Sequence, residues 1–156
     1  MLKNIYRLIF LSAIFFAVSI CAVNAQTVTG SIGNGTFTPG KAVRATVVLS
    51  LPGGLHANSR YPGSEYAVPT TVRVSGSGVR IGAVSYPRGH NRKFEFSSDT
   101  INVYEGRTAF NFNVTVPSTY RGNSIRINVT VKYQACTNEV CYPPKSKQIT
   151  LTARAQ

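Results

Sequence analysis

The sequence contains few of the residues from which metal and acid–base sites are usually built. Its 156 residues include two histidines, His56 and His90, three cysteines and five acidic residues. Neither histidine has cysteines or carboxylates near it at metal-ligand spacing, so the sequence predicts no metal site. It also has no glycine-rich phosphate loop leading into a helix and no Gly-x-Ser-x-Gly motif. These absences argue against P-loop and α/β-hydrolase chemistry, and nothing in the sequence predicts a bound small-molecule cofactor.

Long apolar runs are absent after residue 25, but one stands at the amino terminus. Lys3 and Arg7 precede an almost wholly apolar stretch, residues 8–23, and the chain then turns polar. The tripeptide Val23-Asn24-Ala25 has the modest side chains expected before a signal-peptidase cut. The pattern therefore predicts a secretory signal peptide over residues 1–25. The alternative is an uncleaved anchor, since the run is not far short of the roughly 18–20 residues that span a membrane.

Cleavage after Ala25 leaves one predicted domain, residues 26–156, in the periplasm or outside the cell. Its length suits a single hydrophobic core. Cys21 is lost with the signal peptide, so the domain keeps two cysteines, Cys136 and Cys141. An exported compartment permits a disulfide between them.

Negative charge is scarce in the predicted domain. Without Lys3 and Arg7, 15 of the 17 basic residues remain against 5 acidic ones, a formal charge of +10. Such a balance favours anionic partners in general. The basic residues are scattered, however, with no run longer than Arg92-Lys93. We interpret them as a solvated surface and expect no nucleic-acid partner.

Hydrophobic periodicity predicts strands and no helices in the domain. In residues 124–133, isoleucines and valines alternate with polar side chains, as in a half-buried antiparallel strand. Turn-forming Gly and Pro residues separate this segment from similar ones. The other predicted strands are 42–51, 70–75, 79–85, 100–104, 109–116 and 147–152. About seven short strands in one domain predict an all-β, immunoglobulin-like antiparallel sandwich, with residues 26–40 as a loose leader.

Cys136 and Cys141 lie in the connection between the last two predicted strands. Four intervening residues allow a hairpin to bring their Cα atoms within disulfide range. So short a loop loses little chain entropy on closure, which makes the bond a candidate for reversible chemistry. The alternative is an inert structural staple. Spacing alone favours the staple, because the motif is not Cys-x-x-Cys and no helix start lowers a thiol pKa.

The segment Tyr133-Gln134-Ala135-Cys136, followed by Cys141-Tyr142-Pro143-Pro144, resembles the active-site stretch of the amino-terminal domain family of DsbD, a thiol:disulfide interchange protein. Two further stretches agree in order. Residues 54–59 (GLHANS) with 65–70 (EYAVPT) resemble one family motif, and residues 103–106 (VYEG) resemble a family turn. The resemblance covers about residues 40–152 and favours a redox role.

The resemblance implies an immunoglobulin-like fold and thiol–disulfide exchange without a cofactor. Family members pass electrons from a membrane thiol reductase to periplasmic thioredoxin-like proteins, a circuit linked to cytochrome c-type biogenesis. By this resemblance Cys141 forms the mixed disulfide with the client, and Cys136 resolves it. We expect a separate membrane protein to supply the electrons.

The resemblance also implies a cap over the cysteines. The stretch 92–96 falls in the position of the family's cap loop, so Phe94 or Phe96 is the candidate shield. Ordinary core packing is the alternative for both rings. Tyr133, Gln134, Tyr142 and Pro143 flank the cysteine pair. This sequence has four residues between the cysteines, whereas some family members have five. The competing function is a non-catalytic binding or structural domain with an inert disulfide.

Overall fold

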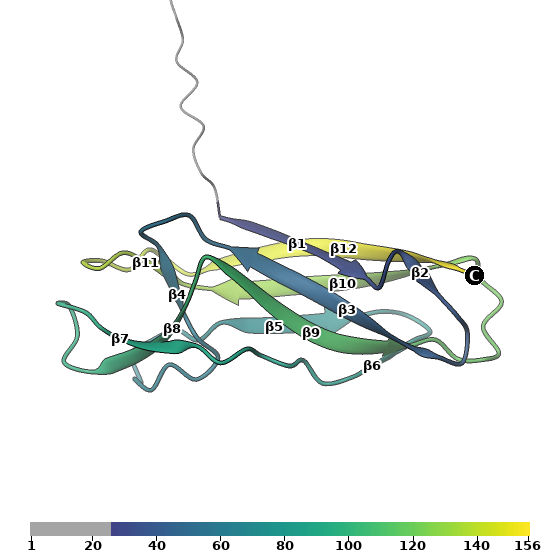
Figure 1. Cartoon of the computed structure of the whole chain (residues 1–156), viewed down its shortest axis with the longest axis horizontal. Helices are drawn as coiled ribbons and strands as arrows, with labels where there is room; N and C mark the ends of the chain where they lie inside the picture. The colour runs from purple at the N-terminus through teal and green to yellow at the C-terminus, as the bar shows by residue number, and fades with distance from the viewer. Residues whose placement is uncertain (1–25) are drawn as a thin grey trace, which may run out of the picture.

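The computed structural model describes residues 26–156, which form an all-β, immunoglobulin-like sandwich (Figure 1). The predicted signal peptide, residues 1–25, lies outside the described residues. Over the described range there is no helix long and apolar enough to cross a membrane. Twelve strands replace the seven expected, because several short strands have no readable alternation.

The first sheet of the sandwich contains four antiparallel strands in the order β1-β3-β9-β6. These are β1 (Thr27–Ile32), β3 (Ala42–Ser50), β9 (Arg107–Thr115) and β6 (Arg80–Ile81). Every second side chain is buried in β9 and, from Ala45 onward, in β3, and the ones between are exposed or half-buried. This period of two places one row of each strand against the core.

The second sheet has the order β2-β12-β10-β5. Its strands are β2 (Thr36–Phe37), β12 (Lys145–Ala155), β10 (Ser124–Tyr133) and β5 (Thr71–Ser75). The pairs within it are antiparallel except for the short parallel pair β2–β12. Strand β10 has the bounds expected from its alternating sequence.

The core lies between these two sheets and consists almost entirely of aliphatic and aromatic side chains. Burial of apolar surface at about 25 cal/mol per Å² is the main force that holds the sheets together. The most deeply buried side chains include Ile32, Val47, Leu49, Phe110, Val114, Ile127, Val129 and Tyr133.

The expectation of a loose leader over residues 26–40 is wrong. Strand β1 pairs with β3 along its whole length, and β2 pairs with β12. Most of β1 is exposed, so its sequence shows no buried row, and backbone pairing at the sheet edge holds it instead. Ile32 and Phe37 then anchor the segment in the core.

A third sheet, with the order β11-β4-β8-β7, closes one end of the sandwich, where Figure 1 shows its strands gathered at the left. Its strands are β11 (Ala135–Cys136), β4 (His56–Asn58), β8 (Thr100–Glu105) and β7 (His90–Lys93). Two of them continue strands of the sandwich: β8 runs into β9, and β10 runs into β11. The third sheet is therefore fixed to both layers of the core.

Glycine makes the turn from β8 to β9 possible. Gly106 has a φ of +59°, a left-handed conformation that side chains disfavour. Its carbonyl accepts a 2.8 Å hydrogen bond from the backbone of Leu51. This turn holds Glu105 at the end of the inner strand β8, opposite His56 of β4.

Candidate functional site

Cys136 and Cys141 form a disulfide across a tight hairpin at the free edge of β11. Their Cα atoms are 4.0 Å apart. Thr137 organises the loop: its backbone nitrogen donates to the Val140 carbonyl at 2.8 Å, and its hydroxyl accepts from the backbone nitrogens of Glu139 and Val140. The hairpin therefore holds both sulfurs on a short, hydrogen-bonded turn.

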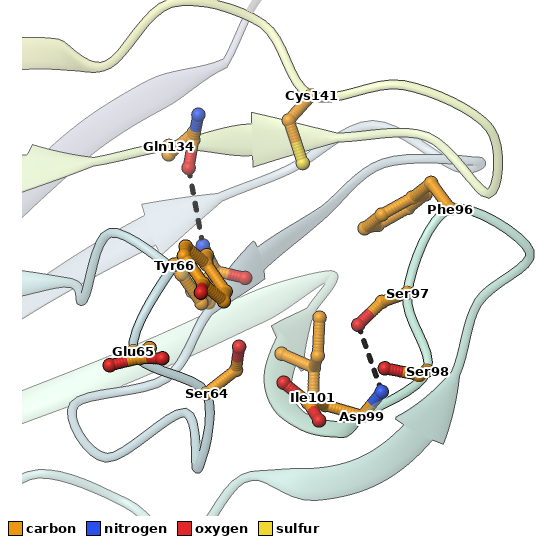
Figure 2. A pocket seen from close by; sticks show the side chains of 12 residues that line it. Ser64, Glu65, Tyr66, Phe96, Ser97, Ser98, Asp99, Ile101, Gln134 and Cys141 are labelled. Atoms are coloured by element: carbon orange, nitrogen blue, oxygen red, sulfur yellow. Dashed lines mark hydrogen bonds between the residues drawn. The ribbon is translucent and has the colours of Figure 1, made fainter.

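The two cysteines differ in their exposure. Cys136 is fully buried, with an exposed fraction of 0%, whereas Cys141 is exposed. Cys141 lines a pocket of about 470 Å³, and Figure 2 shows its sulfur directed into this pocket between Gln134 and Phe96. A partner can therefore reach the sulfur of Cys141 but not that of Cys136.

Gln134 ties the cysteine hairpin to the neighbouring strand β4. Its side-chain nitrogen donates to the Tyr142 carbonyl at 3.1 Å. Its oxygen accepts from the Asn58 amide at 3.4 Å, and Asn58 also donates to the Val68 carbonyl at 3.1 Å. Both amide side chains line the Cys141 pocket, and Figure 2 labels Gln134 in its wall. They fix one wall of the pocket by hydrogen bonds.

Phe94 and Phe96 belong to one aromatic stack but occupy different environments. Phe94 is buried with Ile101 and Val103 in a small apolar cluster apart from the main core. Phe96 stacks on it at 5.2 Å, is 40% exposed and lines the Cys141 pocket. The ring beside Cys141 is therefore Phe96, and Phe94 supports it from below.

Comparison with protein families identifies the chain. Residues 34–153 match the family described as thiol:disulfide interchange protein DsbD, N-terminal. The match spans most of the sequence. The chain belongs to this family. Thiol–disulfide interchange is the chemistry for which the family is named, and Cys136 and Cys141 of this chain form a disulfide.

Two solved structures similar to this DsbD N-terminal family member are bacterial. The reduced N-terminal domain of DsbD from Neisseria meningitidis is 18% identical, with a TM-score of 0.46; the match covers 72% of this chain and 82% of that one. The N-terminal periplasmic domain of ScsB from Proteus mirabilis is 16% identical, with a TM-score of 0.49. That match covers 80% of this chain and 44% of the ScsB chain. No curated protein sequence matches the chain.

The residues expected to flank the cysteines are divided between the core and the surface of this DsbD-type domain. Tyr133 is fully buried, its hydroxyl donates to the Gln26 side chain at 3.2 Å, and burial raises its pKa. Tyr142 and Pro143 are exposed. These three residues do not line the Cys141 pocket, and of the four flanking candidates only Gln134 does.

Apart from Phe96, sequence reasoning missed the opposite wall of the Cys141 pocket. Two loops form it, residues 64–67 before β5 and residues 96–99 before β8 (Figure 2). Tyr66 is the most exposed aromatic residue among the described residues, at 84%. The motif around residue 65 was a signal for the first loop, but sequence order gives no sign that the two loops face the hairpin.

His56 is the second omission, because the sequence placed it only in the family-like motif 54–59 and gave it no role. It lies in β4, is 2% exposed, and its Cα partners are Cys136 on one side and Glu105 on the other. Burial lowers its pKa below the ordinary value of 6.5. Among the described residues, no group of three His, Cys, Asp or Glu side chains has the arrangement of a metal site.

All five carboxylates of the chain lie on the third sheet or its loops. Glu65 and Asp99 line the Cys141 pocket, Glu95 lies between Phe94 and Phe96 in the sequence, Glu105 ends β8, and Glu139 is inside the cysteine hairpin. The strands of the two sandwich sheets carry basic residues and no carboxylate. Charge is thus distributed unevenly between the sandwich and the site.

Proposed function

We propose that the domain exchanges electrons through a reversible Cys136–Cys141 disulfide, with Cys141 as the residue that meets the partner. The observation that carries this proposal is the difference in exposure of the two sulfurs. A mixed disulfide needs one accessible sulfur, and its resolution needs a second sulfur within reach. The hairpin supplies both.

The exchange proceeds through two thiolate attacks. In the reduced domain, the Cys141 thiolate attacks the partner disulfide, and one partner sulfur leaves as a thiolate. The Cys136 thiolate then attacks the Cys141 sulfur, forms the Cys136–Cys141 bond and releases the second partner sulfur. The domain loses two electrons and the partner gains them; the reverse sequence reduces the domain.

Phe96 acts as the shield in this proposal. Its ring borders the pocket into which the Cys141 sulfur points (Figure 2). It is partly exposed and rests on Phe94, which a buried cluster holds in place. A small oxidant meets the ring before it reaches the sulfur, whereas a partner protein can displace the ring on docking.

The partners in this proposal are thioredoxin-like proteins, with a membrane thiol reductase as electron donor, and the compartment is the periplasm. Family membership supports the thioredoxin-like partner. The exposed aromatic rings of Tyr66, Phe96 and Tyr142 support a protein partner rather than a small molecule. The amino-terminal sequence pattern supports export.

The redox potential of the purified protein tests the proposal. We expect a value in the range of exchange proteins, about −120 to −270 mV, in glutathione or dithiothreitol buffers. A Cys136→Ser variant should accumulate a mixed disulfide through Cys141, and a Cys141→Ser variant should accumulate far less because Cys136 is buried.

A disulfide with a reduction potential below about −300 mV in the folded protein would contradict the proposal. The domain would then be a binding or structural module with an inert disulfide.

A further inference from the structure

His56 is a buried titratable residue for which the exchange steps above give no role. Within residues 26–156, its Nε2 is the one buried side-chain nitrogen or oxygen that lacks a hydrogen-bond partner. Buried polar groups in folded proteins are almost always paired, so an exception calls for an explanation.

Strand register places His56 beside Cys136. The two residues are Cα partners in the antiparallel pair of β4 and β11. Side chains at directly opposite positions share one face of the sheet, with Cβ atoms about 4.5–5.5 Å apart. The next pair of positions on the same face is two residues away along each segment, at Asn58 and Gln134. These two side chains follow the same register and hydrogen-bond at 3.4 Å. The imidazole of His56 is therefore the same-face neighbour of the buried sulfur.

Glu105 lies on the other side of His56, as its Cα partner in β8. Its carboxylate accepts a 2.7 Å hydrogen bond from Arg92 and lies 2.9 Å from Nε2 of His90, both on β7. Across the third sheet, thiol, imidazole and carboxylate residues thus occupy successive positions of one row.

A second pocket connects this row to solvent. It has a volume of about 320 Å³ and is lined by His56, Glu105, Arg92 and Asn138, among others. None of its lining residues belongs to the Cys141 pocket. Protons can therefore reach His56 by a route that a partner docked over Cys141 does not occupy.

The charge state of His56 suits a proton acceptor. Burial is the main reason that its pKa is lowered; Glu105 opposes the shift, whereas Arg92 and His90 add to it. Near neutral pH the imidazole is uncharged, and an uncharged imidazole accepts a proton at its free nitrogen.

We propose that His56 accepts the proton of Cys136 when this thiol becomes the attacking thiolate and passes it to solvent; when the disulfide is reduced, His56 relays a proton from solvent back to Cys136. The inference rests on the proposed exchange function and assigns a proton partner to its buried sulfur. In the resolving step the S–H proton moves to Nε2 and the sulfur attacks Cys141. The Cys141–partner bond breaks, and its electron pair leaves with the partner sulfur. The partner thiolate takes a proton from solvent, and His56 releases its proton to solvent through the second pocket, so the imidazole is uncharged again in the oxidised domain.

A purely structural role is the competing explanation. His56 stacks on Phe94 with ring centroids 4.2 Å apart, so its ring also supports the aromatic stack below Phe96. His56→Phe keeps a flat ring for stacking and removes the proton acceptor. His90→Gln is the matched control, because His90 contacts the same Glu105 carboxylate from an exposed position.

Single-turnover reaction of the reduced protein with oxidised glutathione separates the two steps. In His56→Phe we expect an unchanged rate of mixed-disulfide formation at Cys141 and a resolution at least about tenfold slower. In a Cys141→Ser background, thiolate formation at Cys136 should move to higher pH when His56 is replaced, because the thiol then loses its proton acceptor. His90→Gln should leave resolution close to wild type.

Resolution by His56→Phe at the wild-type rate and with the wild-type pH profile would overturn the inference and leave the exchange function standing. Failure of the wild-type protein to form any mixed disulfide would instead remove the exchange function, and the inference with it.

A measurement on the unaltered protein guards against a variant that fails to fold. The ¹⁵N shift of His56 Nε2 should move on reduction, and its titration should become coupled to that of Cys136, as for interacting sites. Identical His56 titrations in the oxidised and reduced protein would overturn the inference.

Discussion

The sandwich and the third sheet bury different kinds of residue. Between the two sandwich sheets the buried residues are nearly all apolar, in long strands of clear alternation. Of the five buried polar residues, His56 and Asn58 lie in β4, Ser59 follows this strand, and Thr70, just before β5, donates a hydrogen bond to the Asn58 carbonyl. The third sheet is thus less well optimised for stability, and this end carries the cysteines.

The difference shows how one chain can combine a stable fold with a reactive end. The long strands β9 and β10 belong to the core, and β8 and β11 extend them into the third sheet. The cysteine hairpin is therefore held by the core without being part of it. Changes at the site should affect reactivity more than stability, and changes in the sandwich should do the opposite.

Truncation of a core side chain should have the largest effect on stability. Ile127 is fully buried between the sandwich sheets, and we expect Ile127→Ala to lower the free energy of unfolding by about 3–5 kcal/mol. The matched variant Ile101→Ala lies in the small cluster below Phe96 and should lose about 2 kcal/mol. Urea unfolding measures both, and equal losses would contradict the division into two regions.

Loss of the disulfide should have a smaller effect. The loop is short, so the chain-entropy model gives about 2 kcal/mol for the double variant Cys136→Ala, Cys141→Ala. Hydrogen exchange should show faster opening of β11 and unchanged sub-global protection of β10. A destabilisation as large as that of Ile127→Ala would show instead that the hairpin is part of the core.

Acidification should weaken the fold through His56. Its pKa is lowered in the folded protein, so below its ordinary value of 6.5 the unfolded chain binds the proton more readily. The free energy of unfolding should therefore fall as the pH drops from about 7.5 through 6.5, and His56→Phe should reduce this slope. Urea unfolding of oxidised wild type and variant at a series of pH values measures it, and equal slopes would contradict the assignment to His56.

Removal of the Phe96 ring should change reactivity with little effect on stability. In reduced Phe96→Ala we expect several-fold faster alkylation of Cys141 by iodoacetamide, since the ring borders its pocket. The free energy of unfolding should stay within about 0.5 kcal/mol of wild type, in addition to whatever the lost stacking on Phe94 contributes. Tyr61→Ala is the control, because Tyr61 is exposed and does not line the pocket. Equal alkylation rates in the two variants would remove the shielding role.

The smallest expected effect comes from Glu105. Its charge raises the pKa of His56 against the effect of burial, so Glu105→Gln should lower that pKa further. NMR titration of the imidazole measures the change. Glu65→Gln is the comparison, since Glu65 lines the other pocket and should leave the titration unchanged.

The sequence predicted the sandwich better than the third sheet, for a physical reason. Strand β10 alternates because one face is buried and the other is wet, and its bounds were predicted correctly. Strand β4 has three consecutive buried residues, and no residue of β7 is fully buried. Neither strand therefore shows the alternation of buried and exposed side chains from which a strand can be predicted. Their positions depend on pairing with β8, which local sequence does not encode.

The candidate site was predicted in part. The cysteine motif located the disulfide, and the stretch 92–96 located the aromatic stack. The roles of Cys136, Cys141, Phe94 and Phe96 stay predictions. The pairing of His56 with Cys136 joins residues 80 positions apart, and only strand register reveals it.

The confinement of the carboxylates to the third sheet gives the molecule an electric dipole. Near Cys141 they offset the basic side chains around them, whereas nothing offsets the basic residues of the sandwich strands. The centre of positive charge is displaced from the centre of mass toward the sandwich. Such a field turns an approaching charged protein before contact, over a distance set by screening, about 8 Å at physiological ionic strength. The domain therefore carries an orientation signal as well as a net charge.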